Sequence, residues 1–242
     1  MRVHFIVHES FAAPGAYETW ARKKGYEVTF SRVYEGEKLP SSVEGIDFLI
    51  VMGGPQDPAT SIETCPHFDS KAEQAVILQA VKAGKAVIGI CLGSQLIGEA
   101  LGATFDHSPE KEIGKFPITL TDEGLTHPLF SHFGPSLDVG HWHNDMPGLT
   151  PDAKVIATSA GCPRQIVAYS ELVYGFQCHM ELTREVVELL IANSQNDLSR
   201  AAEFRFVETP DVLRAHDYDG MNQKLYAFLD KLSEAYRSRN NA

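Results

Sequence analysis

Strand-like and helix-like segments alternate along the first 101 residues, and this alternation limits the fold more than any other feature of the chain. Apolar runs typical of buried strands lie at 3–7, 28–31, 48–52 and 86–90. Segments with helical signals lie at 15–24, from 70 onward and at 94–101. Alternation of this kind is typical of a parallel sheet. We therefore predict an open, mostly parallel α/β sheet with helices on both faces.

The second helix-like segment starts with a capping pattern. Ser70 is followed three residues later by Glu73, the spacing at which each side chain can bond the backbone N–H of the other residue. Val76 and Ala80 then recur at helical spacing. We therefore expect this helix to be capped by Ser70 and Glu73.

Composition and charge exclude several classes of protein. No apolar run approaches the ~20 residues that a membrane helix needs, and the N-terminus reaches a charge too early for a signal peptide. The net charge is −11 and no Lys/Arg cluster stands out, so we expect neither nucleic acid nor a membrane as a partner. The four cysteines form no C-x-x-C pair, which favours a reducing compartment and a cytoplasmic location.

The chain changes character after residue 104. Short β-rich pieces separated by Gly, Pro and Asp lie at 117–121, 155–158, 165–169 and 173–176, and a helix is expected from 183 to about 196. Thr209 and Pro210 indicate a further helix start. An apolar stripe that we expect to pack on the core follows at Met221, Leu225, Phe228, Leu229, Leu232 and Tyr236. We predict one domain over 1–196 and a C-terminal helical extension packed on it over 197–242.

One cysteine lies where a strand-like run gives way to a helix-like one, in the stretch GICLGSQLI (89–97). A thiol at a helix N-terminus is favoured as thiolate, because free N–H groups and the helix dipole stabilise negative charge. Gly89 and Gly93 would allow the sharp strand-to-helix turn of a nucleophile elbow. The stretch alone is equally consistent with Cys91 as a catalytic nucleophile and as a buried core thiol.

A nucleophilic cysteine needs a base, and the base needs a group that orients it. In VYGFQCHMELT (173–183), His179 and Glu181 are two residues apart, so in an extended segment they point to the same side. Each residue alone could be ordinary, His179 as a surface loop histidine and Glu181 as a carboxylate near a helix start. Together with the elbow at Cys91 they indicate a catalytic arrangement at the C-terminal edge of the sheet.

Three motifs in the same order, VMGGPQDP (51–58), GICLGSQLIGEALG (89–102) and GFQCHME (175–181), resemble the class I (triad-type) glutamine amidotransferase family. The resemblance covers roughly 45–196 and is greatest to stand-alone members that are similar to the glutaminase of GMP synthase. It implies a flavodoxin-like fold with Cys91 as nucleophile, His179 as base and Glu181 as orienter.

The same resemblance implies the groups that would surround the substrate. The backbone N–H groups of Gly54 and Leu92 would form the oxyanion hole, which agrees with an elbow and a Gly-Gly turn. Gln95 matches the family glutamine that contacts the substrate. Within GHWHND (140–145), Trp142, Asn144 and Asp145 are the candidates for binding the α-amino and α-carboxylate groups.

One position departs from the family pattern. Many members have Phe-His-Pro-Glu where this chain has CHME (178–181). Met180 therefore replaces a proline, and the loss of backbone stiffness makes the placement of Glu181 less constrained. Cys178 is interpreted as a small hydrophobic residue, with an oxidation partner for Cys91 as the alternative.

Metal and cofactor sites are not expected. His141, His143, Cys178 and His179 could cluster, but none has the C-x-x-C or H-E-x-x-H spacing of a zinc site. The GGPQDP turn also lacks the G-K-[ST] ending of a phosphate loop. We therefore predict no metal and no cofactor.

The resemblance implies an enzyme that hydrolyses the side-chain amide of glutamine through a cysteine thioester and releases ammonia for an acceptor. Residues 197–242 are too few for a synthetase domain, so we expect either a separate synthetase subunit or hydrolysis as the function itself. In a lone chain the Gly53-Gly54 turn is expected to be loosely ordered and glutamine hydrolysis slow. The alternatives are a γ-glutamyl peptidase acting on amides such as glutathione derivatives, and a non-catalytic glutamine-binding or scaffold module.

Overall fold

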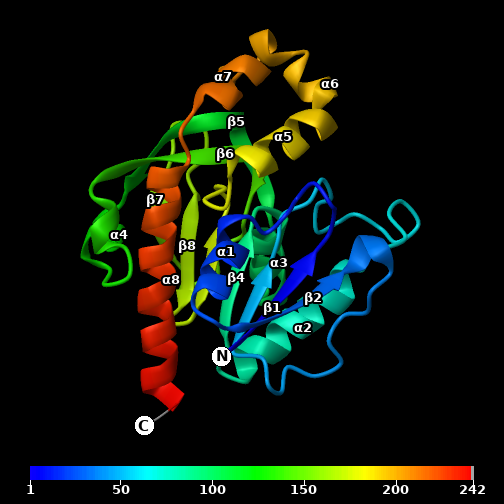
Figure 1. Cartoon of the computed structure of the whole chain (residues 1–242), viewed down its shortest axis with the longest axis vertical. Coiled ribbons are helices and arrows are strands. Elements are labelled where there is room, and N and C mark those ends of the chain that lie inside the picture. Colours follow the sequence, from blue (N-terminus) through cyan, green and yellow to red (C-terminus); the bar gives the residue numbers. More distant parts are fainter. Residues whose placement is uncertain (241–242) are drawn as a thin grey trace.

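The computed structural model describes residues 1–240 and contains one ten-stranded sheet (Figure 1). The strands are β1 (Arg2–Val7), β2 (Glu27–Arg32), β3 (Phe48–Val51), β4 (Ala86–Ile90), β5 (Asp106–Leu120), β6 (Ser136–Met146), β7 (Lys154–Thr158), β8 (Ile166–Ser170), β9 (Val173–Phe176) and β10 (Phe206–Val207). The helices are α1 (Ala16–Lys23), α2 (Ser70–Lys82), α3 (Leu92–Ala100), α4 (Asp122–Thr126), α5 (Arg184–Asn193), α6 (Gln195–Leu198), α7 (Pro210–Ala215) and α8 (Asp219–Asn240).

The order of strands in the sheet is β10-β5-β7-β8-β9-β4-β3-β1-β2, with β6 paired to β5. Strands β2, β1, β3, β4 and β9 run parallel; α1 connects β1 to β2, and α2 connects β3 to β4. Strands β5 to β9 in the second half pair antiparallel. The mostly parallel α/β fold predicted from the sequence is confirmed.

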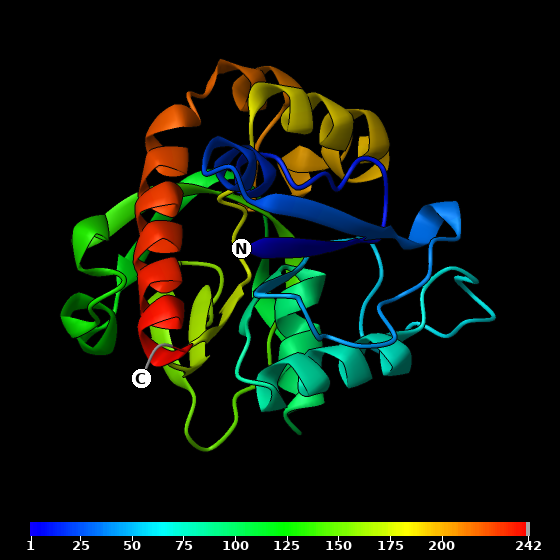
Figure 2. The same ribbon diagram turned by 60° about the horizontal axis from the view of Figure 1, so that its bottom comes forward.

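The sheet separates two hydrophobic cores, since successive residues of a strand point to opposite faces. On β3, Phe48 and Ile50 belong to the core under α1 and α8, whereas Leu49 and Val51 belong to the core under α2 and α3. Figures 1 and 2 show the long helix α8 on the far side of the sheet from α2. Strand β4, which ends at Ile90, therefore lies buried between helical layers.

The cap of α2 differs from the predicted one. Asp69 is the N-cap and accepts a hydrogen bond from the Ala72 N–H at 2.9 Å, while the Ser70 hydroxyl donates to the Pro58 carbonyl at 2.8 Å. Glu73 does not return to the helix start, because its carboxylate is fully buried and bonds His8. The predicted capping box of Ser70 and Glu73 is therefore wrong, and Glu73 instead makes a tertiary contact with His8.

The middle of the chain forms longer strands than the sequence indicated. Strands β5 and β6 make an extended antiparallel hairpin with an irregular register between His107 and Glu112. Glu and Lys residues that are buried or half-buried, together with this irregularity, obscure the period-two pattern of β5, so the sequence indicates a strand only over 117–121. The segment 140–145 lies within β6.

Helix α8 packs the predicted apolar stripe into the core. All six stripe residues from Met221 to Tyr236 are buried. Thr209 is the N-cap of α7 with Pro210 at its first position, as predicted, and the predicted domain boundary at 196 falls inside helix α6.

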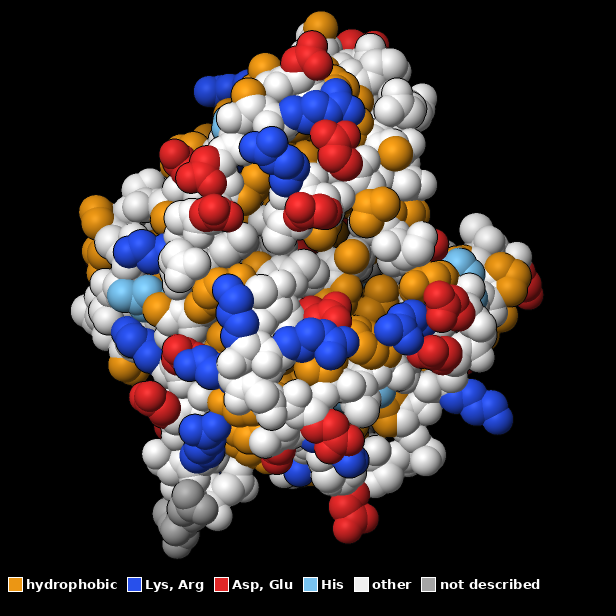
Figure 3. Space-filling view, viewed as in Figure 1, with side chains coloured by type: hydrophobic (Ala, Val, Ile, Leu, Met, Phe, Trp, Pro, Cys, Tyr) orange, Lys and Arg blue, Asp and Glu red, His pale blue; other side chains and the backbone are white. Residues whose placement is uncertain are grey.

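Between residues 1 and 240, no helix combines the length and the apolar character required to cross a bilayer. Basic and acidic side chains are interspersed over the face seen in Figure 3.

Phe228→Ala is expected to lower the free energy of unfolding by about 3–5 kcal/mol, because it leaves a cavity in the core. The Phe228 ring is fully buried. Its centroid lies 4.9 Å from the centroid of the Phe130 ring, 5.1 Å from that of Phe176 and 5.3 Å from that of Tyr174. Urea denaturation measures the change. Leu189→Ala, at an exposed position of α5, is the control and should cost less than about 0.5 kcal/mol. Equal effects of the two variants would contradict the assignment of α8 to the core.

Candidate active site

Cys91 lies between β4 and α3 in a left-handed backbone conformation, with φ of 50°. Among residues 1–240 it is the only non-glycine residue with positive φ. The neighbouring residues Gly89 and Gly93 allow this turn because they have no Cβ. A Cβ at Gly89 would lie 2.2 Å from the Gly93 carbonyl oxygen, and a Cβ at Gly93 would lie 2.0 Å from the Val51 carbonyl oxygen; both distances are too short for a side chain. The stretch therefore has the backbone of an elbow, and a strained residue held by its surroundings is a recurring feature of functional sites.

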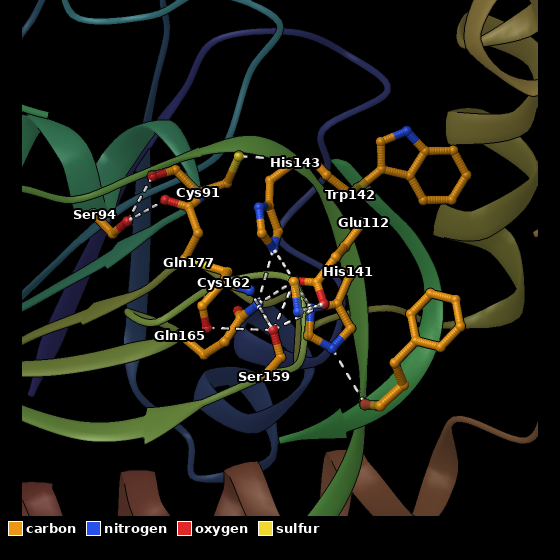
Figure 4. Close-up of polar contacts among 12 residues, drawn as sticks. Cys91, Ser94, Glu112, His141, Trp142, His143, Ser159, Cys162, Gln165 and Gln177 are labelled. Carbon is orange, nitrogen blue, oxygen red and sulfur yellow. Dashed lines mark hydrogen bonds and ion pairs between the residues drawn. The ribbon is translucent and has the colours of Figure 1, made fainter. Parts of the chain in front are cut away.

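The elbow opens into a cleft of about 300 Å³. Cys91 lines this cleft, and its Sγ lies 3.9 Å from the carbonyl oxygen of Trp142 (Figure 4). The thiol is at the N-terminus of α3, where the helix dipole favours a negative charge.

His179 and Glu181 face the same cleft. The His179 Nδ1 lies 2.6 Å from Glu181 Oε1, so the carboxylate fixes the orientation of the ring. A Cβ placed on Gly53 would be 3.3 Å from Cys91 Cβ and 3.4 Å from His179 Cε1, which puts the imidazole directly beside the cysteine. The three residues predicted to act together are thus adjacent in space.

The electrostatics of His179 suit proton transfer. Burial lowers the pKa of the imidazole, but the Glu181 carboxylate and the neighbouring Cys91 sulfur outweigh it and raise the pKa of His179 to about 10. Within the described residues, the buried Nε2 has no hydrogen-bond partner. His179 is therefore cationic at neutral pH, with one nitrogen free for the thiol or a substrate.

The backbone around Glu181 is fixed by contacts that replace the missing proline stiffness. The Glu181 carbonyl accepts from the Ala16 N–H at 3.0 Å at the start of α1. Asn222 of α8 donates to the Met180 carbonyl at 2.8 Å and to that of Leu182 at 3.1 Å. The role of Asn222 was missed in the sequence, because no local pattern links a helix residue to carbonyls 40 and 42 positions earlier.

The two residues predicted to form the oxyanion hole are neighbours in space. A Cβ on Gly54 would be 3.3 Å from Leu92 Cδ2, and Gly54 lines the cleft. Within residues 1–240, neither the Gly54 N–H nor the Leu92 N–H has a protein acceptor. The Leu92 side chain is buried in the core beside α2.

The predicted substrate-binding residues also line the cleft. Gln95 is buried; its Nε2 donates to Gln177 Oε1 at 3.2 Å, while its Oε1 has no partner among the described residues. Trp142 donates its indole N–H to the Ser194 hydroxyl at 3.0 Å. Asp145 bonds His107 at 2.5 Å, and Asn144 is exposed at the rim.

A buried polar network supports β6 from behind (Figure 4). Glu112 is fully buried and accepts hydrogen bonds from Ser159 at 2.8 Å and from Gln165 at 2.6 Å, while His143 Nε2 lies 3.3 Å away. His141 and His143 point into this network, so Trp142 between them points to the cleft. Sequence reasoning noticed the two histidines but missed Glu112.

This network does not match a metal site well, although Glu112, His141 and His143 each present a ligand atom within 4.8 Å of the others. Both Glu112 oxygens already accept hydrogen bonds, and the Gln165 amide nitrogen lies 3.1 Å from His143 Nε2. Donors that satisfy a buried carboxylate are sufficient to explain it. We therefore assign the cluster a structural role.

Cys178 is fully buried in the core under α1 and α8, and burial raises the pKa of its thiol well above the usual range. All four cysteines are free thiols. The environment of Cys178 agrees with its interpretation as a small hydrophobic residue.

Among known sequences, this chain is similar to an amidotransferase-like protein over its whole length and to two proteins named as synthases or synthase components. The glutamine amidotransferase-like protein YfeJ of Salmonella typhimurium is 60% identical over 239 residues, which are 99% of this chain and 100% of YfeJ. Anthranilate synthase component 2 of Helicobacter pylori is 28% identical over 75% of this chain and 89% of its own. The GMP synthase of Caldanaerobacter subterraneus is 30% identical over 60% of this chain, and the match spans only 26% of that synthase.

Comparison with solved structures supports the fold. The crystal structure of SMU.1228c superposes with a TM-score of 0.94 at 47% identity and covers 96% of this chain and 100% of its own. A glutamine amidotransferase from Thermotoga maritima has a TM-score of 0.84 at 24% identity, with 96% and 97% coverage.

The family model described as "Glutamine amidotransferase class-I" matches residues 18–193 of this chain. These residues include β4, the elbow at Cys91 and the segment with His179 and Glu181. Members of this family are cysteine-dependent amidohydrolases. The chain belongs to the class I glutamine amidotransferase family.

Proposed function

We propose that this protein hydrolyses the side-chain amide of glutamine through a thioester on Cys91 and releases ammonia. The observation that carries the proposal is the placement of Cys91, in a left-handed elbow, beside an imidazole that a carboxylate holds at 2.6 Å. A nucleophile, a base and an orienting group in this relation define covalent acyl-transfer catalysis.

In the first half of the reaction, the Cys91 sulfur attacks the carboxamide carbon and a C–S bond forms. The charge that develops on the amide oxygen is stabilised by the N–H groups of Gly54 and Leu92. The C–N bond then breaks, and His179 gives its proton to the leaving nitrogen, which departs as ammonia. In the second half, His179 takes a proton from water as the water oxygen attacks the thioester, and glutamate and the thiolate are released.

The remaining cleft residues are proposed to bind the amino-acid end of the substrate. Gln95 offers a buried amide oxygen, and Asp145 offers a carboxylate that can accept from an α-amino group. Trp142 and Asn144, from the same strand, complete the wall and rim. This half would be shared by glutamine and by other γ-glutamyl compounds.

We further propose that the ammonia serves an acceptor on a separate cytoplasmic chain. Two relatives, GMP synthase and anthranilate synthase component 2, carry the names of synthases, and the second is named as one component of its synthase. We propose that the chain that receives the ammonia is likewise a synthase subunit.

The purified chain should hydrolyse glutamine, and Cys91→Ala should reduce kcat/KM to the background while leaving the melting temperature nearly unchanged. Cys91 lines the cleft and the substitution removes only its sulfur atom, so the variant loses the chemistry and keeps the fold. Released ammonia and glutamate are measured. Cys162→Ala, which removes a buried thiol outside the cleft, is the control and should keep the wild-type kcat/KM.

γ-Glutamyl peptides are assayed in parallel. If one of them turns over at least about tenfold faster than glutamine in kcat/KM, equivalent to about 1.4 kcal/mol, the peptidase function replaces the glutaminase function. Failure of every γ-glutamyl substrate would favour the non-catalytic module.

Glu181→Gln is expected to lower kcat by about 10²-fold with little change in KM, because the orienter acts in the transition state. It should also shift the alkaline limb of the pH profile. Wild-type His179 stays protonated until about pH 10, and removal of the carboxylate lowers its pKa, so activity should be lost at a lower pH. The pH dependence of kcat/KM measures this shift.

Glu185→Gln makes the same chemical change at an exposed position four residues later and should leave both kcat and the pH profile unaltered. An unchanged alkaline limb in Glu181→Gln would show that another carboxylate orients the base.

A further inference from the structure

A buried ion pair lies directly behind the oxyanion turn. His8 follows β1 and is fully buried, with Nε2 2.8 Å from Glu73 Oε2 on α2. Its other nitrogen, Nδ1, lies 3.0 Å from the carbonyl oxygen of Gly53. The Phe68 ring and the imidazole pack in a T-shaped arrangement, with centroids 5.6 Å apart. No step of the proposed reaction uses this pair.

Both nitrogens of His8 face groups that can only accept a hydrogen bond, a carboxylate and a carbonyl. Burial lowers the pKa of His8, but the Glu73 carboxylate and the Gly53 carbonyl outweigh this effect and the pKa is raised. His8 therefore donates from both nitrogens, and the bond to Gly53 is assisted by charge, which makes it stronger than a neutral one.

The bond to Gly53 also fixes the direction of the neighbouring N–H group. The carbonyl of Gly53 and the N–H of Gly54 belong to one planar, trans peptide unit, so they point in opposite directions. When His8 holds the carbonyl on one side, the Gly54 N–H must point to the other side. Rotation of this peptide would break a buried, charged hydrogen bond.

The other side of the peptide is the cleft. Gly53 borders Cys91 and His179, Gly54 lies next to Leu92, and the cleft is lined by both glycines. A Cβ on Gly54 would lie 3.1 Å from the His8 Cβ, so the turn also packs closely on the histidine. The Gly54 N–H therefore points away from His8, on the side of the turn that lines the cleft with Cys91.

The residue after His8 holds the far end of the same turn. Glu9 Oε1 accepts from Gln56 Nε2 at 2.7 Å and lies 3.0 Å from His67 Nε2. Two consecutive residues after β1 therefore hold positions 53 and 56. The sequence predicts a loosely ordered turn, whereas these contacts hold the turn at two positions.

We propose that His8, supported by Glu73, is a positioning residue that presets the Gly54 N–H as an oxyanion donor, so that the chain catalyses amide hydrolysis without a partner protein. This inference rests on the proposed function of Cys91 and its neighbours. It predicts that the isolated chain reaches its full kcat, because the donor does not wait for a synthetase to order it.

A matched pair of substitutions at His8 separates its two contacts. His8→Asn retains a donor near the position of Nδ1 and so keeps the bond to Gly53, whereas His8→Gln retains a donor near Nε2 and keeps only the bond to Glu73. We expect kcat to fall about 10²-fold in His8→Gln with KM within about twofold, since the loss of one oxyanion donor has that scale. In His8→Asn, kcat should fall less than about fivefold.

A purely structural role of His8 predicts a different order. His8→Asn leaves the buried Glu73 carboxylate without its partner and should lower the melting temperature more than His8→Gln does. Activity that follows the melting temperature, with His8→Asn the less active variant, would overturn the inference. If either variant fails to fold, His8→Leu/Glu73→Leu replaces the pair by apolar residues and should show the same 10²-fold loss in kcat with a native melting temperature. An unchanged kcat in this double variant would also overturn the inference.

Alkylation of Cys91 by iodoacetamide distinguishes the inference from the proposed function, because the reaction with this reagent needs no oxyanion donor. Equal alkylation rates in wild type and His8→Gln, together with the loss in kcat, would support positioning. A wild-type chain that hydrolyses glutamine only with an added synthetase would overturn autonomous catalysis and leave the proposed function standing. A chain that hydrolyses no γ-glutamyl substrate under any condition would overturn both.

Discussion

The left-handed backbone of Cys91 is the constraint on which the rest of the site depends. An L-residue adopts this conformation at a cost, and here the close approach of Gly89 to Gly93 and of Gly93 to Val51 holds it. The Cys91 N–H donates to the Phe176 carbonyl at 2.7 Å, so the elbow is also tied to the neighbouring strand β9. These contacts place the Cys91 sulfur at the C-terminal edge of the sheet, directly after the end of β4.

The parallel order of the strands then brings the base, the oxyanion turn and His8 to the same edge of the sheet. Strands β9, β4, β3 and β1 are neighbours, and their C-terminal ends meet at one edge. In that order they lead into His179, Cys91, the Gly53-Gly54 turn and His8. Elements distant in sequence stabilise this row: Asn222 of α8 holds the segment of Glu181, and Glu73 of α2 holds His8. A synthetase is therefore not needed to explain the geometry of the site in this chain.

The sequence was sufficient where the determinant is local. An elbow is specified by small residues within two positions of Cys91, and the pairing of His179 with Glu181 follows from the two-residue period of an extended segment. Contacts across the fold left no such signal. Glu73 has the spacing of a capping box, but it bonds His8 instead of the helix start. In the β5–β6 hairpin, an irregular register interrupts the two-residue period that a sequence pattern would reveal. Glu112 and Asn222 have meaning only once distant strands and helices have met.

We propose Cys91 as the nucleophile for a γ-glutamyl substrate. Diazo-oxo-norleucine, a glutamine analogue with an electrophilic carbon, labels such a nucleophile covalently, and digestion followed by mass spectrometry identifies the modified residue. We predict a single adduct on Cys91 and protection of that residue by excess glutamine. An adduct on Cys65, Cys162 or Cys178, with Cys91 unmodified, would contradict the account.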